Sequence, residues 1–343
     1  MPLQSLPLKC LPLVAARDEP TEHRAPVVGR RSSSGFGRRR VVTPPTMSEF
    51  VDTPVLRVAY DVSGPADGHP VLAVHGWPDD IHCWDGVLPH LHRAGCRVYR
   101  PYLRGFGPTR FHSPDRPRSG QIGALGRDLA DFLDALDLRD VVVAGHDWGA
   151  RAGYVLGSLF PDRLRALVAM SAGYSTNRPD APLPYSLTHA YWYEWFVASA
   201  RGRRALDDDR RDLCRYLWTT WSPEWDFTES AFAQAAGAWD NPDWAEVSVH
   251  AYLHRWGEAA GDPAYQDIED RLAEPPLIRV PTLVVHGECD GDNLASTTEG
   301  KDELFADAYR RVVLPGIGHF PPREEPRATA DAILQLTPST TVR

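Results

Sequence analysis

The sequence predicts an α/β fold, with a mostly parallel central sheet flanked by helices and an inserted helical cap. From Val55 onward, short apolar runs alternate with helical patterns, which is typical of chains that build a parallel sheet covered on both faces. The alternation stops near Ala172 and resumes near Pro275, and no convincing strand pattern lies between these points. We therefore expect two parts of one sheet domain with a helical insertion between them.

Apolar runs bounded by turn residues mark the expected strands. They lie at residues 56–62, 71–74, 97–102, 141–145, 166–170, 282–285 and 310–314. Apolar residues at helical spacing predict a helix over 122–136, and a second helix is expected over 150–160. The first helix leads directly into the strand at 141–145, and the second follows that strand.

The chain divides into four segments. Residues 1–46 carry eight Lys or Arg against three acids, with several Pro and Ser, and are predicted to be a disordered basic extension. A start of translation at Met47 is the simpler hypothesis for this segment. Residues 47–172 and 275–343 are expected to form the two parts of the sheet domain, and residues 173–274 the cap.

Tryptophan is concentrated in the expected cap. Eight of the eleven tryptophans lie there: Trp192, Trp195, Trp218, Trp221, Trp225, Trp239, Trp244 and Trp256. Most of these rings are expected to build the core of the cap itself. An aromatic lid over an open sheet edge would also give a small apolar substrate a dry pocket.

Composition excludes several classes of protein. The 343-residue chain has a net charge of -9, which gives no reason to expect nucleic acid, and its apolar stretches are far shorter than a membrane helix of roughly 18 residues. The five cysteines are scattered and never form a C-x-x-C pair, which predicts neither a disulfide framework nor a structural zinc site. A reducing cytoplasm fits this pattern best.

The segment Gly145-His146-Asp147-Trp148-Gly149 has the layout of a nucleophile elbow. In such an elbow, small residues flank a nucleophile held in a strained turn between a strand and a helix. Hydrolases usually carry serine there, whereas this chain has Asp147. The plain alternative is that Asp147 caps the following helix, because aspartate is frequent at helix starts.

Three further motifs follow predicted strands. His75-Gly76-Trp77-Pro78 makes a tight turn whose Trp77 N–H, together with the N–H of Trp148, would form an oxyanion hole. Asp290 follows the strand at 282–285, with Glu288 and Asp292 close enough to compete for the role of acid. His319 follows the last strand. The chain order is therefore Asp, Asp, His, which is the hydrolase order with a changed nucleophile.

These four motifs together resemble the α/β-hydrolase fold family over residues 47–336, including the cap position. By motif the chain is most similar to epoxide hydrolases and haloalkane dehalogenases, which share the HGxP turn and the aspartate elbow. The resemblance implies a triad of Asp147, Asp290 and His319. It also implies a substrate pocket, which we expect to be lined by His75, Pro78, Trp192, Trp195 and Phe320.

The chemistry of a carboxylate nucleophile leads to the same substrate class. Asp147 is ionised at neutral pH and needs no base to activate it, since an aspartate has an ordinary pKa near 3.9. With an ordinary ester its attack would simply reverse, whereas attack on the sp3 carbon of an epoxide or alkyl halide gives an ester of Asp147. Water activated by His319 could then cleave that ester while Asp290 orients the imidazole.

The leaving group distinguishes an epoxide from a halide. A halide needs only N–H donors such as indoles, whereas an epoxide oxygen leaves as a basic alkoxide and needs a proton donor such as tyrosine. The segment around Tyr193 resembles the first-tyrosine segment of epoxide hydrolases, with Tyr191 as a neighbour that a register error could substitute. Tyr252 lies where those enzymes carry a second tyrosine, although Leu253 follows it where arginine is common.

The sequence therefore predicts a cofactor-free and metal-free epoxide hydrolase that acts on a small apolar epoxide and water. Neither nucleic acid nor a membrane is expected as a partner, and a homo-oligomer is left open. The alternatives are a haloalkane or haloacetate dehalogenase with the same nucleophile and a non-catalytic ligand-binding homologue. A haloacetate dehalogenase would carry arginine directly after the nucleophile, where this chain has Trp148.

Overall fold

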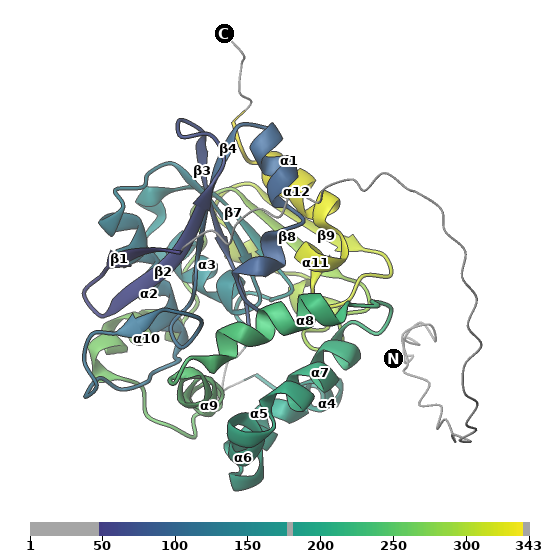
Figure 1. The fold of residues 1–343 in the computed structure, drawn as a ribbon. Helices are drawn as coiled ribbons and strands as arrows, with labels where there is room; N and C mark the ends of the chain where they lie inside the picture. Colours follow the sequence, from purple (N-terminus) through teal and green to yellow (C-terminus); the bar gives the residue numbers. More distant parts are fainter. Residues whose placement is uncertain (1–47, 177–180, 339–343) are drawn as a thin grey trace, which may run out of the picture. The chain divides into compact units, whose positions relative to one another are not determined.

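A nine-stranded sheet forms the centre of the fold in the computed structural model, which describes residues 48–176 and 181–338 (Figure 1). The strands follow the order β1-β2-β4-β3-β6-β7-β8-β9, and β5 pairs with β2. Their bounds are β1 Glu49–Asp52, β2 Leu56–Ser63, β3 His69–Val74, β4 Cys96–Pro101, β5 Arg110–Phe111, β6 Val141–His146, β7 Leu164–Met170, β8 Thr282–Gly287 and β9 Tyr309–Leu314. The predicted extension at residues 1–46 lies outside the described residues.

The sheet is parallel from β4 through β9, and only β1, β2 and β5 pair in antiparallel fashion. Each of the seven strands expected from the sequence is present. The strands β1 and β5 were not predicted, because both are short and β1 is largely exposed, so neither carries the apolar run that marks a buried strand. Both lie at the antiparallel side of the sheet.

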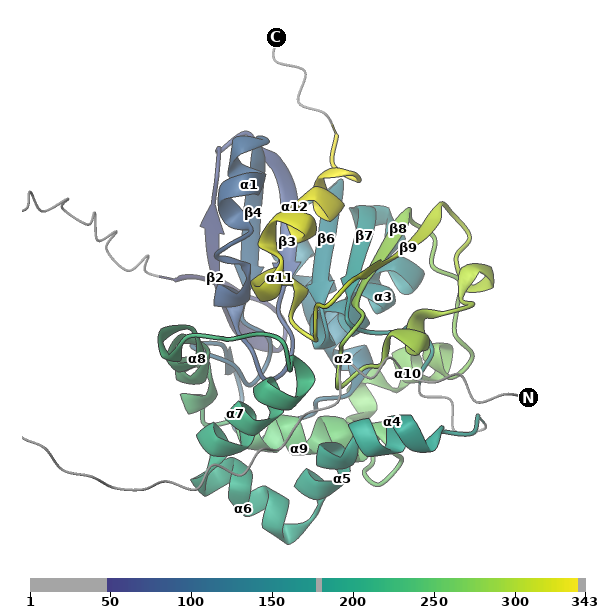
Figure 2. The same ribbon diagram turned by 90° about the vertical axis from the view of Figure 1, so that its right-hand side faces the viewer.

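The strand β6 is buried along its whole length, which explains its uninterrupted apolar sequence. Val142 and Ala144 pack in one cluster with Leu91 and Ile333, which come from the helices α1 (Leu88–Arg93) and α12 (Pro326–Leu334). The alternate residue Val143 packs in another cluster that includes residues of the helices α2 (Ile122–Ala135) and α3 (Trp148–Leu159). Helices therefore cover both faces of the sheet, as Figures 1 and 2 both show.

Helices fill the described chain between β7 and β8, at the position where the cap was expected. Figure 2 shows them gathered at one end of the sheet, below it in that view. The helices of the whole fold are α1 Leu88–Arg93, α2 Ile122–Ala135, α3 Trp148–Leu159, α4 Tyr185–Ala190, α5 Trp192–Ala198, α6 Ala200–Asp208, α7 Arg210–Trp221, α8 Glu229–Ala236, α9 Trp244–Arg255, α10 Gln266–Ala273, α11 Pro321–Glu324 and α12 Pro326–Leu334. The predicted helices at 122–136 and 150–160 correspond to α2 and α3.

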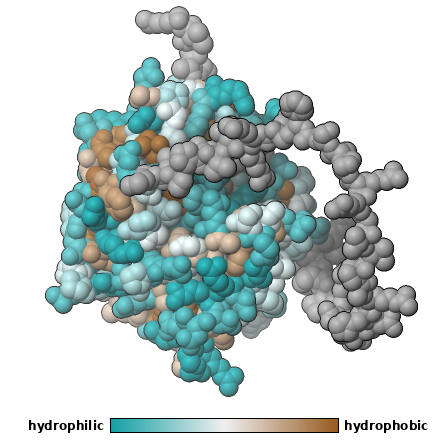
Figure 3. All heavy atoms as spheres, viewed as in Figure 1, coloured by the Kyte–Doolittle hydropathy of each residue, from teal (hydrophilic) through white to brown (hydrophobic). Residues whose placement is uncertain are grey.

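Several tryptophan rings of the cap point inward, whereas its charged helix α6 is largely exposed. Trp218, Trp221, Trp239 and Trp244 are fully buried, whereas only Gly202 and Leu206 are buried in the charged helix α6. The lower part of the face in Figure 3, which carries the cap, is accordingly mostly hydrophilic. Within the described residues, none of the helices has the length and apolarity needed to cross a membrane.

Candidate active site

Asp147 occupies the sharp turn between β6 and α3 with φ 49° and ψ -111°, a backbone conformation that L-residues rarely adopt. Its carboxylate makes no cap hydrogen bond to α3, so the alternative of a simple helix cap does not describe it. The turn is tight, because a Cβ atom at Gly149 would lie 2.4 Å from the Val74 carbonyl oxygen, and one at Gly145 would lie 2.3 Å from the Gly149 oxygen. The glycines therefore make the elbow possible.

The turn after β3 lies directly against the elbow. The backbone N–H of Trp77 donates a hydrogen bond of 2.9 Å to Oδ1 of Asp147. A Cβ atom at Gly76 would lie 2.5 Å from the Asp147 Cβ, so glycine lets the two turns approach. Trp148 is the first residue of α3, whose initial N–H groups have no carbonyl partner within the helix. Both expected oxyanion-hole amides thus belong to turns beside the carboxylate.

His319 and Asp290 form a buried pair next to the elbow. Nδ1 of His319 lies 3.0 Å from each carboxylate oxygen of Asp290, and Nε2 of His286 lies 3.2 Å from Asp290 Oδ2. Burial alone would raise the pKa of Asp290, but the charge of His319 and the hydrogen bonds from both histidines lower it to about 2. Asp290 is therefore a stable anion that fixes the orientation of the imidazole.

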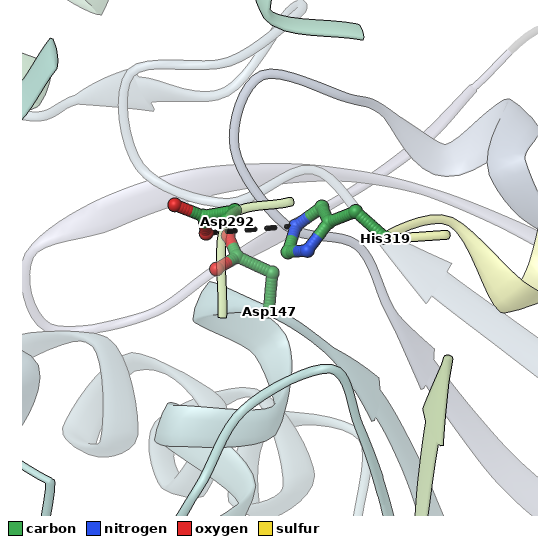
Figure 4. A group of neighbouring side chains, drawn as sticks. All are labelled: Asp147, Asp292 and His319. Carbon is green, nitrogen blue, oxygen red and sulfur yellow. Dashed lines mark ion pairs between the residues drawn. The ribbon is translucent and has the colours of Figure 1, made fainter. Parts of the chain in front are cut away.

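The other ring nitrogen of His319 faces two more carboxyl groups. One oxygen each of Asp147 and Asp292 and one nitrogen of His319 all lie within 4.8 Å of one another, and Figure 4 shows the three side chains converging. Burial alone would lower the pKa of His319, but the charges of Asp290, Asp292 and Asp147 raise it to about 9. Burial raises the pKa of Asp292 to about 8; the His319 charge opposes this, while Asp290 and Asp147 add to it.

Asp147, Asp292 and His319 also form the group of side chains in the described chain that could hold a metal ion. His319 Nε2 and Asp292 Oδ2 are 4.0 Å apart, whereas two ligands of a tetrahedral zinc ion at about 2.1 Å from the metal lie about 3.4 Å apart. The side chains would have to approach one another to bind a small cation.

A cluster of stacked rings lies over the elbow. The Trp77 indole stacks on Tyr193 of α5 at a centroid distance of 5.6 Å and packs edge-on against Tyr252 of α9 at 5.3 Å. Tyr252 also packs on the Trp148 ring at 5.8 Å, and the two tyrosine rings are 5.3 Å apart. The structure therefore brings both predicted tyrosines together with the residues of the elbow.

The two tyrosine hydroxyls hold their protons firmly. Burial is the largest cause for both, and it raises each pKa well above the ordinary value of 10. The next cause for Tyr252 is the charge of Asp147, whereas for Tyr193 it is the charge of Asp292. Tyr193 also donates a hydrogen bond of 3.3 Å to Glu194. Tyr191, the other candidate, donates instead to Asn293 Oδ1 at 2.8 Å.

Three expected pocket residues lie beside the site, where each contacts a neighbouring residue of the fold. His75 Nε2 accepts a hydrogen bond from the Leu103 N–H at 3.1 Å, and burial lowers the pKa of this histidine to about 4, so it is neutral. The Pro78 carbonyl oxygen accepts a hydrogen bond from the Trp218 indole at 3.1 Å. The fully buried Phe320 ring packs 5.0 Å from the His319 ring.

Two expected pocket residues, Trp192 and Trp195, are not brought to the elbow. Trp192 is 37% exposed and packs on Tyr216, and Trp195 stacks on Trp256 at 4.7 Å. The reason is helical geometry, because residues of α5 that are one or two positions from Tyr193 point away from the face that Tyr193 occupies. The expectation that these two indoles line the pocket is corrected accordingly.

Sequence reasoning missed two residues of the site. His286 is the penultimate residue of β8 and contacts Asp290 four residues later, a spacing that could have signalled a second partner for the acid. Glu194 is buried and accepts hydrogen bonds from Trp256, at 2.6 Å, and from Arg255, at 3.1 Å. A single carboxylate within the aromatic run 192–196 was the available signal, because a buried charge needs partners.

Comparisons with known proteins agree on one family. The sequence profile described as "alpha/beta hydrolase fold" matches residues 69–326. Epoxide hydrolase 3 of Siraitia grosvenorii is 33% identical over 130 residues, which are 38% of this chain and only 40% of that protein. Epoxide hydrolase A of Mycobacterium tuberculosis is 24% identical over 324 residues, 84% of this chain and 96% of that protein. The match thus spans about two fifths of the plant relative and nearly all of the bacterial one.

Solved structures include similar chains. The crystal structure of a candidate epoxide hydrolase from Klebsiella pneumoniae has a TM-score of 0.80 and 36% identity, covering 84% of this chain and 96% of that chain. A second candidate epoxide hydrolase, from Pseudomonas aeruginosa, has a TM-score of 0.71 at 21% identity and covers 85% of this chain and 95% of that chain. The second likeness shows the fold alone.

Proposed function

The chain belongs to the alpha/beta hydrolase fold family, in its epoxide hydrolase-like part, and on that premise we propose that it opens an epoxide to a vicinal diol. The observation that carries the proposal is the position of Asp147, an anionic residue type on a strained elbow with an N–H donor 2.9 Å from its Oδ1. His319 lies beside it with Nδ1 held by Asp290.

The first step forms an ester. An oxygen of Asp147 attacks an epoxide carbon, the ring C–O bond breaks, and the electron pair stays on the departing oxygen. A tyrosine hydroxyl gives its proton to this alkoxide, which is a stronger base than a phenolate. Tyr252 is the better placed donor, because its ring packs on that of Trp148, directly after Asp147, whereas the Tyr193 hydroxyl donates to Glu194. Tyr193 packs against Tyr252 and supports the same oxygen.

The second step cleaves that ester. Esterification removes the negative charge of Asp147, one of the charges that raise the pKa of His319, and so favours the neutral imidazole. His319 Nε2 then takes a proton from water, and the water oxygen attacks the ester carbonyl. The N–H groups of Trp77 and Trp148 stabilise the tetrahedral oxyanion. The C–O bond to the product breaks, the alkoxide takes the proton from His319, and the proton of the new Asp147 carboxyl returns to the tyrosine.

The two buried tyrosines favour an epoxide over a halide. A halide ion needs no proton, so a dehalogenase has no use for two phenols at the nucleophile, although the Trp148 indole fits either reaction. The buried aromatic surroundings favour a small apolar epoxide as substrate. The route requires water and no cofactor, and a cytoplasmic location remains a prediction.

Parallel turnover of styrene oxide and 1-bromobutane tests the proposal. We expect diol without bromide from the wild type and neither product from Asp147→Asn. In a single turnover in H₂¹⁸O, the label should enter the carboxyl group of Asp147, because the water oxygen replaces the one transferred to the diol. Bromide without diol would make the protein a dehalogenase. Normal ligand binding without turnover of either compound would favour a non-catalytic homologue.

A further inference from the structure

We propose that Asp292 is a second catalytic acid of this site, whose carboxyl group holds, together with His319 Nε2, the water molecule that hydrolyses the Asp147 ester. The inference rests on the proposed function, since it assigns a role in its second step. Four observations carry it: the spacing of the three side chains, the absence of a structural task for Asp292, the scaffold that fixes it, and its burial.

The spacing fits a shared water. Three atoms whose separations do not exceed 4.8 Å all lie within about 2.8 Å of a common point, which is an ordinary hydrogen-bond length. The 4.0 Å between His319 Nε2 and Asp292 Oδ2 is also close to the separation of about 4 to 4.5 Å between two acceptors of one water. With both O–H groups donated to these atoms, a lone pair of the water can face the Asp147 carbonyl carbon.

Asp292 has no evident task in holding the fold together. It is only 1% exposed, yet its one ion pair among the described residues is with His319 at 4.0 Å. Asp292 Oδ1 and His319 Nε2 are buried and lack a hydrogen-bond partner in the described chain. A buried carboxyl oxygen without a partner costs stability, so such an oxygen beside a catalytic base indicates function.

A chain of hydrogen bonds holds Asp292 in place. Its N–H donates to Asp290 Oδ1 at 2.9 Å, and its Oδ2 accepts from the Asn293 side chain at 2.8 Å. The Asn293 Oδ1 in turn accepts from the Tyr191 hydroxyl at 2.8 Å and from Arg151 at 2.9 Å. The carboxyl group that receives the water is thus fixed before the substrate arrives, as efficient positioning requires.

The test separates the two half-reactions. After rapid mixing with styrene oxide and acid quenching, intact mass gives the rate at which the Asp147 ester forms and the rate at which it decays. In Asp292→Ala we expect formation within twofold of the wild type and decay slowed at least tenfold, so that the ester accumulates. Asp292→Asn keeps an acceptor oxygen beside Asn293, and its decay rate should return to within about threefold of the wild type.

The matched control is Glu288→Gln on the same loop. Glu288 is exposed and accepts a hydrogen bond from the Gly316 N–H at 3.0 Å, and both of its rates should remain unchanged. Decay within twofold of the wild type in Asp292→Ala would overturn the inference, as would equal slowing of both half-reactions with a lowered melting temperature. A wild type that forms no ester with any epoxide would instead overturn the proposed function itself.

Discussion

The imidazole of His319 is held by Asp290 through a single ring nitrogen, with Nδ1 at 3.0 Å from both carboxylate oxygens. This contact leaves Nε2 as the nitrogen that faces Asp147 and Asp292. An amide cannot replace the carboxylate without loss, because it removes the negative charge that stabilises the imidazolium and can stabilise the wrong tautomer. The pair therefore sets the protonation state of the base.

Asp290→Asn should slow hydrolysis of the ester far more than its formation. We expect the decay rate to fall by about ten-thousandfold, as for the corresponding change in other triads, while Asp147 still reacts with the epoxide. Quenched-flow mass spectrometry should then find most of the enzyme as the ester. If formation fell as much as decay, the part of Asp290 in positioning His319 for the second step would be refuted.

Tyr252→Phe should slow formation of the ester rather than its hydrolysis, because the phenol protonates the departing epoxide oxygen. We expect formation to fall by about a hundredfold, and Tyr193→Phe to cause a smaller loss, since general acids typically contribute a factor of 10² to 10⁴. Tyr216→Phe is the matched control, because Tyr216 of α7 is 57% exposed. If the double variant Tyr193→Phe and Tyr252→Phe formed the ester at an unchanged rate, both rings would have only a packing role.

The triad residues could be predicted from the sequence because the neighbouring strand alone sets the position of each one in the fold. Asp147 directly follows the buried strand β6, and Asp290 and His319 lie in the loops that follow β8 and β9. The ends of parallel strands meet at one edge of a sheet, so chain order alone was enough to predict that these three residues lie together. Turn glycines such as Gly149 were visible for the same local reason.

The cap could not be predicted in the same way. Whether Tyr193 or Trp192 faces the elbow depends on how α5 is rotated against its neighbours, and aromatic residues on both faces leave no apolar stripe to settle it. The position of Asp292 depends on the Asn293 side chain, which accepts hydrogen bonds from Tyr191 and Arg151, two residues distant in sequence. An acid in a glycine-containing loop otherwise suggests an exposed turn residue.

Gly149→Ala should destabilise the fold, because the added Cβ would lie 2.4 Å from the Val74 carbonyl oxygen, a backbone atom that cannot move easily. We expect the free energy of unfolding to fall by about 2 to 3 kcal/mol, with loss of activity. Gly237→Ala is the control, since a Cβ there meets nothing within 4 Å. Denaturant unfolding measures both, and equal stability of the two variants would show that the elbow tolerates a side chain.

Asp292→Asn should stabilise the protein increasingly as the pH rises. The pKa of Asp292 is raised from the ordinary value of 3.8 to about 8, so between these values the folded state binds a proton that the unfolded state has lost. The free energy of unfolding of the wild type therefore falls as the pH rises through this range, by at most about 1.4 kcal/mol per pH unit from this group. Asparagine does not titrate, so the free energy of unfolding of the variant lacks this decrease.

The cleanest comparison of Asp292→Asn with the wild type lies between about pH 4.5 and pH 5.5. His319 stays protonated in both the folded and the unfolded state there, since its pKa is raised from 6.5 to about 9. Asp290, Asp147 and Glu194 are the other charged groups that act on Asp292, and the folded pKa of Asp290, about 2, lies below the window. The stability gained by the variant, measured by urea unfolding, should grow across it. A constant difference would show that Asp292 is ionised in the folded protein throughout.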